Sequence, residues 1–263
     1  MTSREKLPLS IAIITLNEEE RLDDCLTSAS FANDIVVVDS GSTDGTAAIA
    51  KSYGARVFQE DWQGFGPQKQ RAIGHCKNNW VLVLDADERI SSALAEEIRS
   101  IVENAGPNNA YAIPRKNYFL KRWIKHAGWW PDYVVRLINK DYCQMNTKPV
   151  HESIEVANRK IGKLHNPLIH HATRNIEHTM AKMDRYSSIG AKELFDNNEK
   201  ASYSKALSRG TWAFFYNYIL RMGFRDGSPG FIIAISDALN KFFKYAKLVE
   251  HSNHHKKPDL SPS

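Results

Sequence analysis

Two carboxylates stand one residue apart in Asp85-Ala86-Asp87, directly after the apolar run Trp80–Leu84. In open α/β sheets, ligands bind beyond the carboxyl ends of the strands. Carboxylates at such a point can share one hard cation, Mg²⁺ or Mn²⁺, which takes oxygen ligands and can bridge the phosphates of a nucleotide diphosphate. A D-x-D pair also occurs in solvated loops, so its position after a buried strand is what favours a metal site.

A second candidate binding element ends the apolar run that begins at Asp34. Asp39 closes this expected strand, and the small residues from Ser40 to Gly45 form a turn that opens a helix. Such a turn exposes backbone N–H groups, and the Asp39 carboxylate can accept hydrogen bonds from a base or ribose. The turn lacks the GxGxxG spacing of dinucleotide-binding folds and the GK[ST] of P-loops, so neither NAD binding nor ATP hydrolysis is favoured.

Alternating strands and helices in the first hundred residues are expected to position these groups. The apolar runs predict strands at 9–15, 34–39, 55–58 and 80–84. The helical spacing predicts helices at 18–30, 46–53, 68–76 and 91–102. Strands that are apolar on both faces and separated by helices indicate an α/β fold, with a mainly parallel sheet and helices on both faces.

The rest of the chain changes character twice. Residues 110–172 are rich in Trp, Tyr, His and Pro, with strand-like pieces at 133–138, 153–156 and 167–171. Within this part, Trp123, Trp129 and Trp130 suit either stacking on the rings of a ligand or packing in a core or lid. Amphipathic helices are then expected at 175–198, 206–222 and 231–248, with a Gly- and Pro-containing connection at 223–230.

Length, cysteines and hydropathy limit the possible classes of protein. The 263 residues suffice for one large α/β domain with a modest appendage. The three cysteines, Cys25, Cys76 and Cys143, match neither a disulfide framework nor a zinc motif and suit a reducing compartment. Neither a secretory signal nor an apolar run of roughly 18 residues is recognisable, so we expect a cytoplasmic protein.

Positive charge is concentrated in the C-terminal part of the chain. From Lys200 onward, ten Lys and Arg residues oppose four Asp and Glu residues, a net charge of +6. The expected helix 231–248 places Lys241, Lys244 and Lys247 mostly opposite its apolar stripe. Amphipathic helices with basic polar faces fit an anionic membrane surface. The alternatives are packing of the stripes on the catalytic domain and a solvated basic face.

Several motifs in one order resemble inverting glycosyltransferase family 2, which has the GT-A fold. They are T-x-N-E-E from Thr15, VVVDSGSTDGT from Val36, QKQRA from Gln68 and W-x-L-x-L-D-A-D-E from Trp80. More narrowly, the chain is similar to the bacterial lipopolysaccharide-core β-glucosyltransferases of this family. That similarity continues through Pro131-Asp132-Tyr133, Val150-His151-Glu152, Leu168-Ile169-His170 and Asp184-Arg185-Tyr186-Ser187.

The resemblance implies a group of residues that bind the nucleotide sugar. They are Thr15, Asn17, Glu18, Asp39, Ser40, Gly41, Lys69, Gln70 and Asp85. Within this group, Asp39 is expected to bind the uracil or ribose, and Lys69 and Gln70 to lie over the nucleotide and donor sugar. Related enzymes often carry Arg and Asn at these last two positions.

The resemblance also implies a metal site and a general base. Asp87 is expected to be the main ligand of Mg²⁺ or Mn²⁺, with Asp85 and His170 as further ligands. An inverting transfer is a single displacement, in which a carboxylate opposite the leaving diphosphate takes the proton of the attacking hydroxyl. Glu152 is the expected base and Asp132 the alternative. Each residue also has a purely structural interpretation: Glu152 as a partner in an ion pair, and Asp132 as the cap of a turn.

The resemblance implies transfer of a hexose, with glucose expected, from a UDP-sugar to a lipopolysaccharide core (heptose) or other lipid-linked acceptor. The basic helices add peripheral attachment to the inner face of the cytoplasmic membrane. The alternatives are a family 2 enzyme with another glycan, lipid or protein acceptor, and a related nucleotidyltransferase. A nucleic-acid-binding protein would explain the pI of 9.0, but without a recognisable module we expect no nucleic-acid partner.

The expected domain organisation follows from these assignments. A GT-A catalytic domain is expected at 1–174, with a donor half at 9–104 and an acceptor half at 105–174. A helical extension at 175–250 and a polar tail at 251–263 complete the chain.

Overall fold

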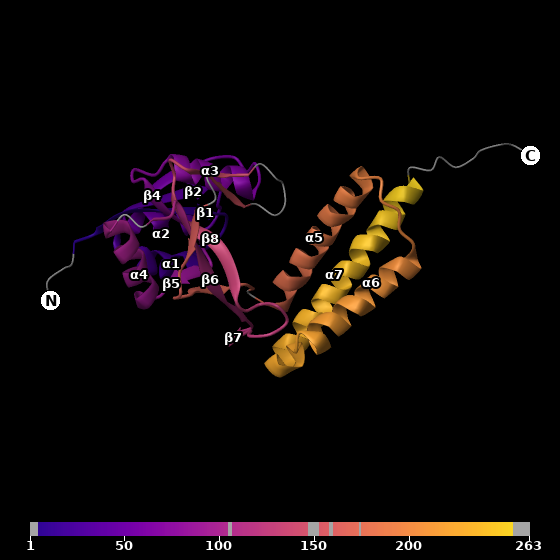
Figure 1. Cartoon of the computed structure of the whole chain (residues 1–263). Helices are drawn as coiled ribbons and strands as arrows, with labels where there is room; N and C mark the ends of the chain where they lie inside the picture. The colour runs from indigo at the N-terminus through magenta and orange to yellow at the C-terminus, as the bar shows by residue number, and fades with distance from the viewer. Residues whose placement is uncertain (1–4, 105–106, 147–152, 158–159, 174, 255–263) are drawn as a thin grey trace, which may run out of the picture. The chain divides into compact units, whose positions relative to one another are not determined.

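The computed structural model describes residues 5–104, 107–146, 153–157, 160–173 and 175–254 (Figure 1). The chain forms two compact units. The sheet unit comprises residues up to Lys116 together with Pro131–His170, and the helical unit comprises Asn117–Trp130 together with the chain from His171 onward. The predicted domain boundary after residue 174 stays a prediction.

A mixed β-sheet forms the centre of the sheet unit, which confirms the predicted α/β fold. Its parallel part has the order β3-β2-β1-β4 and consists of β1 (Leu7–Thr15), β2 (Ala32–Asp39), β3 (Arg56–Gln59) and β4 (Trp80–Asp85). Beyond β4 the order continues with β8 (Asp132–Asn139), β6 (Ala110–Phe119), β12 (Leu168–His171) and β5 (Glu88–Ile90). The pairs β4–β8, β8–β6 and β12–β5 are antiparallel. The short strands are β7 (Arg122–Trp123), β9 (Cys143–Met145), β10 (Ile154–Val156) and β11 (Ile161–Lys163).

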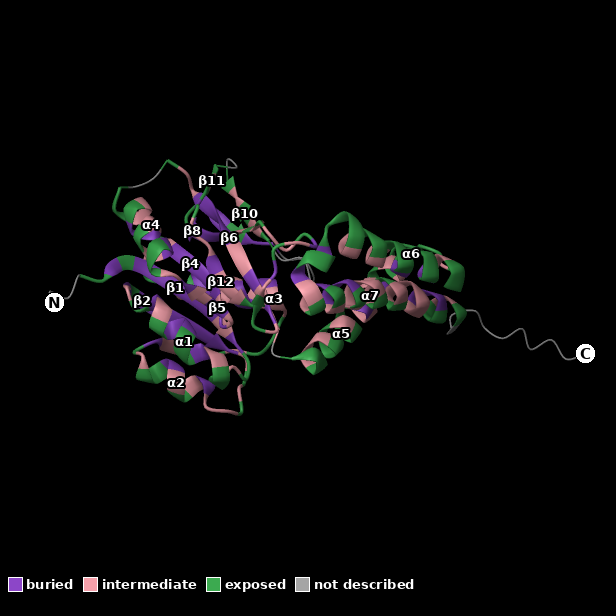
Figure 2. Cartoon of the chain, turned by 90° about the horizontal axis from the view of Figure 1, so that it is seen from below, coloured by how far each residue is buried: buried purple, intermediate pink, exposed green. Residues whose placement is uncertain are grey.

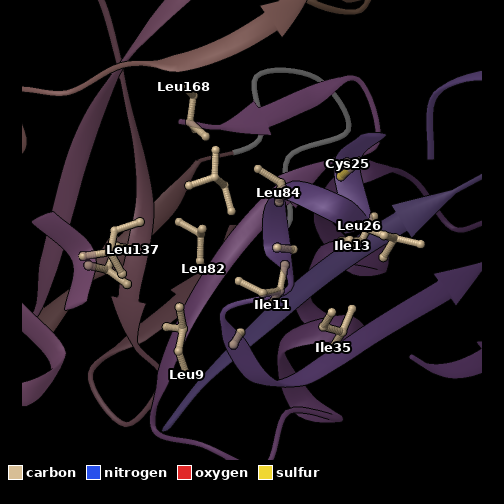
Figure 3. Close-up of a cluster of buried hydrophobic side chains, with 14 of the residues drawn as sticks. Leu9, Ile11, Ile13, Cys25, Leu26, Ile35, Leu82, Leu84, Leu137 and Leu168 are labelled. Atoms are coloured by element: carbon tan, nitrogen blue, oxygen red, sulfur yellow. The ribbon is translucent and has the colours of Figure 1, made fainter. Parts of the chain in front are cut away.

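Helices cover both faces of this sheet, as the apolar strands predict. One face packs on α1 (Glu19–Ala29), α2 (Thr46–Ser52) and α4 (Ser92–Glu103). Figure 3 shows this core, in which Leu26 of α1 lies near Ile13 and the strand leucines of β4. The other face packs on α3 (Phe65–Gly74) through Ala72 and Ile73. Because both layers are apolar, removing the strands from water drives the formation of the sheet unit.

Three helices dominate the helical unit: α5 (Ile176–Asp196), α6 (Tyr203–Phe215) and α7 (Gly227–His254). The long α7 lies beside both others (Figures 1 and 2). The π-helical turn η2 (Tyr216–Leu220) continues α6, and the 3₁₀ turn η3 (Gly223–Asp226) leads into α7. The predicted connection at 223–230 is therefore wrong in its second half. Pro229 lies in the first turn of α7, where a missing N–H removes no intrahelical hydrogen bond.

The structure also corrects the expected lysine face of α7. The Lys247 ammonium donates to Oδ1 of Asp184 at 2.6 Å and to the hydroxyls of Ser187 and Ser188 at 2.9 and 2.8 Å. Its three donors are therefore used on α5, and Lys247 is not available to a lipid headgroup. Basic residues elsewhere on the helices must supply any attraction to an anionic surface.

Among the helices described, none has the length and apolar character needed to cross a bilayer. The predicted polar tail at 251–263 overlaps α7, which continues to His254. Its remaining residues lie outside the described part of the chain.

Candidate functional site

Strand register brings the predicted donor-binding residues to one edge of the sheet. Thr15 pairs with Asp39 across β1 and β2, and Ile14 pairs with Asp85 across β1 and β4. These positions are the carboxyl ends of three neighbouring parallel strands. The groups identified from strand endings in the sequence therefore lie side by side, at the edge where α/β sheets bind ligands.

Asp39 organises the turn that follows β2. Its buried carboxylate accepts hydrogen bonds from the Thr15 hydroxyl at 2.9 Å, from the Gly41 and Ser42 amides at 3.2 and 2.9 Å, and from the Ser42 hydroxyl at 2.5 Å. Four donors match the roughly four lone-pair positions of a carboxylate. A base or ribose that binds Asp39 must therefore displace one of them, and this predicted contact stays a prediction.

The loop after β1 is fastened to the same turn. The Asn17 side-chain carbonyl accepts from the Thr43 amide at 2.9 Å, and the Asn17 amide donates to the Ser42 hydroxyl at 2.8 Å. The Glu18 amide donates to the Thr46 hydroxyl at 2.8 Å. Asn17 takes a left-handed conformation with φ of 54°, which Asn tolerates better than most residues. The two loops thus form one fixed rim beside Thr15 and Asp39.

Asp85 is surrounded by cations. Lys69 Nζ lies 3.0 Å from its Oδ1, and Arg136 Nη2 bonds its Oδ2. The same Arg136 nitrogen lies 2.8 Å from Glu88, which is fully buried and also accepts from the Asp85 amide at 3.0 Å. Burial alone would raise the pKa of Asp85, but Arg136 and Lys69 hold it far below its usual range. Asp85 therefore stays ionised and balances two nearly buried positive charges.

Asp87 has a different set of neighbours. Its Oδ2 lies 3.6 Å from His170 Nε2 and 3.5 Å from Arg21 Nη1. The antiparallel pairing of β12 with β5 sets His170 opposite Glu88, so a residue far along the chain reaches the D-x-D segment. Burial raises the pKa of Asp87, but the hydrogen bond and charge of His170 outweigh it and lower the pKa overall. The expected Asp87–His170 proximity is present.

We tested whether this pair fits a divalent cation. In the described ranges, no group of three or more His, Cys, Asp or Glu side chains has metal-binding geometry. Asp87 and His170 offer one carboxylate and one imidazole on the same side of the segment. Mg²⁺ commonly keeps waters and binds through one or two protein carboxylates plus substrate phosphates. The two side chains therefore fit a cation whose remaining ligands come from the donor diphosphate and water.

The two candidate bases differ in what the structure says about them. Asp132 Oδ2 accepts from Arg115 Nη2 at 2.7 Å and from Nε at 3.0 Å, because β6 and β8 pair these residues directly. The Arg115 guanidinium therefore already occupies one oxygen of this carboxylate. Glu152, the expected base, lies outside the described residues.

The remaining predicted residues divide between the site and the scaffold. The Ser40 hydroxyl accepts from Gln68 at 3.0 Å at the rim. Gln70 accepts from the Met145 amide at 2.7 Å and thereby joins α3 to β9. The buried Glu88, Arg136 and Arg115 network was not assigned a role from the sequence. The one signal in the sequence was Glu88, which directly follows the D-x-D segment. A carboxylate that is buried at such a position needs a cation as its partner.

Comparison with known proteins identifies the family. The model of the family described as "Glycosyl transferase family 2" matches residues 10–161. A glycosyltransferase of Rickettsia bellii is 34% identical over 256 residues, which cover 93% of this chain and 87% of the relative. The lipopolysaccharide core biosynthesis glycosyltransferase LpsC of Rhizobium meliloti is 31% identical over 260 residues, 93% of each chain.

Among solved structures, S. aureus TarS 1–349 in complex with UDP-GlcNAc has a TM-score of 0.49 and 14% sequence identity. The alignment covers 94% of this chain and 91% of that chain. The family model spans more than half of the present sequence, and relatives above 30% identity extend over nearly all of it. The protein therefore belongs to glycosyltransferase family 2.

Proposed function

We propose that this glycosyltransferase moves a hexosyl group, with glucose the expected sugar, from a UDP-sugar onto a lipopolysaccharide core (heptose) acceptor, with inversion at the anomeric carbon. The observation that carries the proposal is the Asp87–His170 pair beside the ion-paired Asp85, at the carboxyl edge of the parallel strands. Support for the acceptor comes from LpsC, whose name places it in lipopolysaccharide core biosynthesis.

The donor would lie across the rim formed by the loops after β1 and β2. Backbone amides of the turn at Ser40 and Gly41 and the Asn17 loop shape this rim, while Asp39 keeps it rigid. Asp87 and His170 would hold Mg²⁺ or Mn²⁺, which when bound stabilises negative charge on the diphosphate leaving group. Asp85 would contribute indirectly, because its pairing with Lys69 and Arg136 fixes the end of β4.

Glu152 is our proposed general base, which takes the proton of the acceptor hydroxyl as that oxygen attacks the anomeric carbon. Asp132 remains the alternative. Its ion pair with Arg115 argues against it, because an acceptor hydroxyl would have to compete with two guanidinium hydrogen bonds for the same oxygen.

A peripheral position on an anionic membrane is part of the same proposal. Much of α6 is exposed (Figure 2). The large apolar residues exposed on α6 and η2 are Leu207, Trp212, Phe215, Tyr216, Ile219 and Leu220. Arg221 lies over the Tyr216 ring at 4.8 Å, so a guanidinium borders this surface. Aromatic and aliphatic groups beside arginine suit the boundary between acyl chains and anionic headgroups.

A donor screen tests the proposal. Purified protein would be incubated with UDP-glucose, UDP-galactose, UDP-GlcNAc and GDP-mannose, with Mn²⁺, Mg²⁺ or chelator, and release of the nucleotide would be measured. We expect UDP-glucose to be preferred, metal to be required, and transfer to a heptose-containing core oligosaccharide to exceed hydrolysis. Equal rates in chelator would contradict the metal assignment, and preference for another donor would replace glucose.

A further inference from the structure

A cavity of about 200 Å³ lies in the helical unit. Its walls come from the 117–130 segment, from α5 and from α7, and all of its lining residues belong to this one unit. Pockets for drug-sized ligands occupy roughly 300–1,000 Å³, so this cavity has room for a single small ring.

Aromatic side chains form part of the wall. Trp129 packs edge-on against Phe119 with ring centroids 6.0 Å apart, which fixes its orientation. Tyr186 of α5 lines the cavity and is 39% exposed, so it stands where the cavity meets solvent. Flat apolar rings at such positions suit a ligand that has an apolar face.

Polar groups of α7 line the same cavity. Asp237 and Asn240 are one helical turn apart, and Thr179 of α5 also contributes. Asp237 Oδ2 accepts from Asn217 at 3.0 Å, and Lys241 provides the nearby positive charge. Burial nevertheless raises the pKa of Asp237 to about 6. Near neutral pH its carboxylate is therefore charged but poorly hydrated, and a ligand hydroxyl that donates to it would restore a lost hydrogen bond.

We infer that this cavity binds one saccharide ring of the acceptor glycan, with its C–H face against Tyr186 and Trp129 and its hydroxyls on Asp237 and Asn240. Sugars combine an apolar ring face with a polar edge, which matches aromatic walls beside a carboxylate and an amide. That the ring belongs to the acceptor rests on the proposed function, whereas recognition of a saccharide rests on the cavity itself.

Other ligands fit the wall less well. An acyl chain would place hydrocarbon against the Asp237 carboxylate and remove its remaining hydration at high cost. A phosphate group would meet the same carboxylate with Lys182 as the one lysine among the lining residues. The wall combines aromatic and aliphatic side chains, among them Met183 and Ile233, with amide, hydroxyl and carboxylate groups. This mixture favours an uncharged ring that has one apolar face and several hydroxyls.

Ligand-observed NMR on the full chain tests this inference. The probes are methyl glycosides of glucose, galactose and mannose, measured by saturation transfer with UDP present. We expect transfer to at least one glycoside, and about tenfold weaker binding for Asp237→Asn and Tyr186→Ala. The matched controls, Asp196→Asn and Tyr203→Ala, change the same residue types at exposed positions outside the cavity and should bind like the native chain.

The outcomes separate this inference from the proposed function. Absence of glycoside binding by the native chain, or equal binding by all four variants, would overturn the saccharide site, as would binding of octanol in place of the glycosides. UDP-glucose turnover is measured on the same samples. Glycoside binding without any turnover would contradict the proposed function and leave the cavity assignment standing. Thermal unfolding of each variant identifies any loss of binding that comes from loss of fold.

Discussion

Asp85 and Asp87 are the same residue type two positions apart, but their surroundings assign them different tasks. Asp85 lies between Lys69 and Arg136, both nearly buried, and neutralises them. Asp87 shares one oxygen with Arg21 and His170 at longer distances of 3.5 and 3.6 Å. The first carboxylate is therefore held by two cations, while the contacts of the second are longer, and the expected roles of both as ligands stay predictions.

Substitution should separate these tasks. Asp87→Ala is expected to abolish transfer and metal-dependent UDP binding while changing the free energy of unfolding by less than about 1 kcal/mol. Asp85→Ala leaves buried cations without their partner and should lower that free energy by about 3 kcal/mol. Urea unfolding and UDP titration with Mn²⁺ measure the two effects. Full activity of Asp87→Ala in chelator would refute the metal assignment.

The general base can be identified by isosteric changes. Glu152→Gln cannot accept the acceptor proton, so turnover should fall by roughly 10²–10⁴ with little change in donor affinity. Asp132→Asn should have a smaller effect on turnover, because Arg115 already occupies that carboxylate. Steady-state rates and UDP affinities distinguish the two, and the reverse pattern would exchange their roles.

The partly buried Asp237 carboxyl should make stability depend on pH. Its folded-state pKa of about 6 exceeds its ordinary value of 3.8, so folding favours the protonated form. The resulting stabilisation is complete below the ordinary value and is lost as pH rises through 6. Burial causes the shift and the positive charge of Lys241 opposes it, while Lys182 is a further cation that lines the same cavity.

Asp237→Asn removes this titration. Relative to the native chain, the variant should gain up to about 3 kcal/mol between roughly pH 4 and pH 7. Unfolding experiments at several pH values measure the difference. A stability difference that does not change with pH would show that Asp237 titrates normally in the folded protein.

At the scale of elements, the local sequence was sufficient to predict a strand or helix whose own residue pattern determines its structure. The strands β1, β2 and β4 and the helix α4 were predicted and confirmed. The Ser91 side chain begins α4 by accepting from the Leu94 amide at 3.2 Å. The long strand β6 was missed, because Pro114 and the following charged residues argue against a central strand.

The site shows the same division. Strand endings predicted that Asp39 and Asp85 share an edge, because parallel strands end on the same side. The Arg136–Glu88 and Arg115–Asp132 pairs were not predicted. These ion pairs depend on the register in which β8 and β6 pair with strands that are distant in the sequence. That register cannot be predicted from the spacing or periodicity of residues.

The exposed face of α6 and η2 offers a test of membrane attachment. Trp212→Ser combined with Ile219→Ser should weaken sedimentation with anionic vesicles, because two large apolar groups no longer enter the interface. Added salt should also release the native chain. Tyr142→Ser, at an exposed position of the sheet unit, is the matched control. Vesicle binding that is unchanged both by salt and by the double substitution would exclude this surface as the membrane contact.

At the scale of the whole molecule, the two compact units are interleaved along the chain. Phe119 and Ile124 of the 117–130 segment are buried with Ile233 of α7. The buried Asp226 accepts from the amides of Lys125 and His126, at 3.3 and 2.8 Å. The helical unit therefore combines residues 117–130 with the chain from His171 onward. In the sequence, residues 131–170 of the sheet unit lie between these two segments.

A fragment that ends at residue 174 tests the consequence. It retains the sheet edge but loses α7, so Phe119 and Ile124 lose a buried partner. We expect the fragment to aggregate, and replacement of both residues by Ser to restore solubility and UDP binding. Light scattering and UDP titration measure this. A monodisperse unmodified fragment would show that the 117–130 segment does not need the C-terminal helices.

This interleaving also has a consequence during synthesis. Ile124 leaves the ribosome well before Ile233, the α7 residue that shares its buried cluster. At about 5–20 residues per second, the intervening stretch of about 110 residues takes roughly 5–20 seconds to make. Throughout that interval the apolar segment lacks its partner on α7, although the sheet can fold once β12 has been made. Nascent chains of this protein should therefore be substrates for ribosome-bound chaperones, and their need for help should end when α7 emerges.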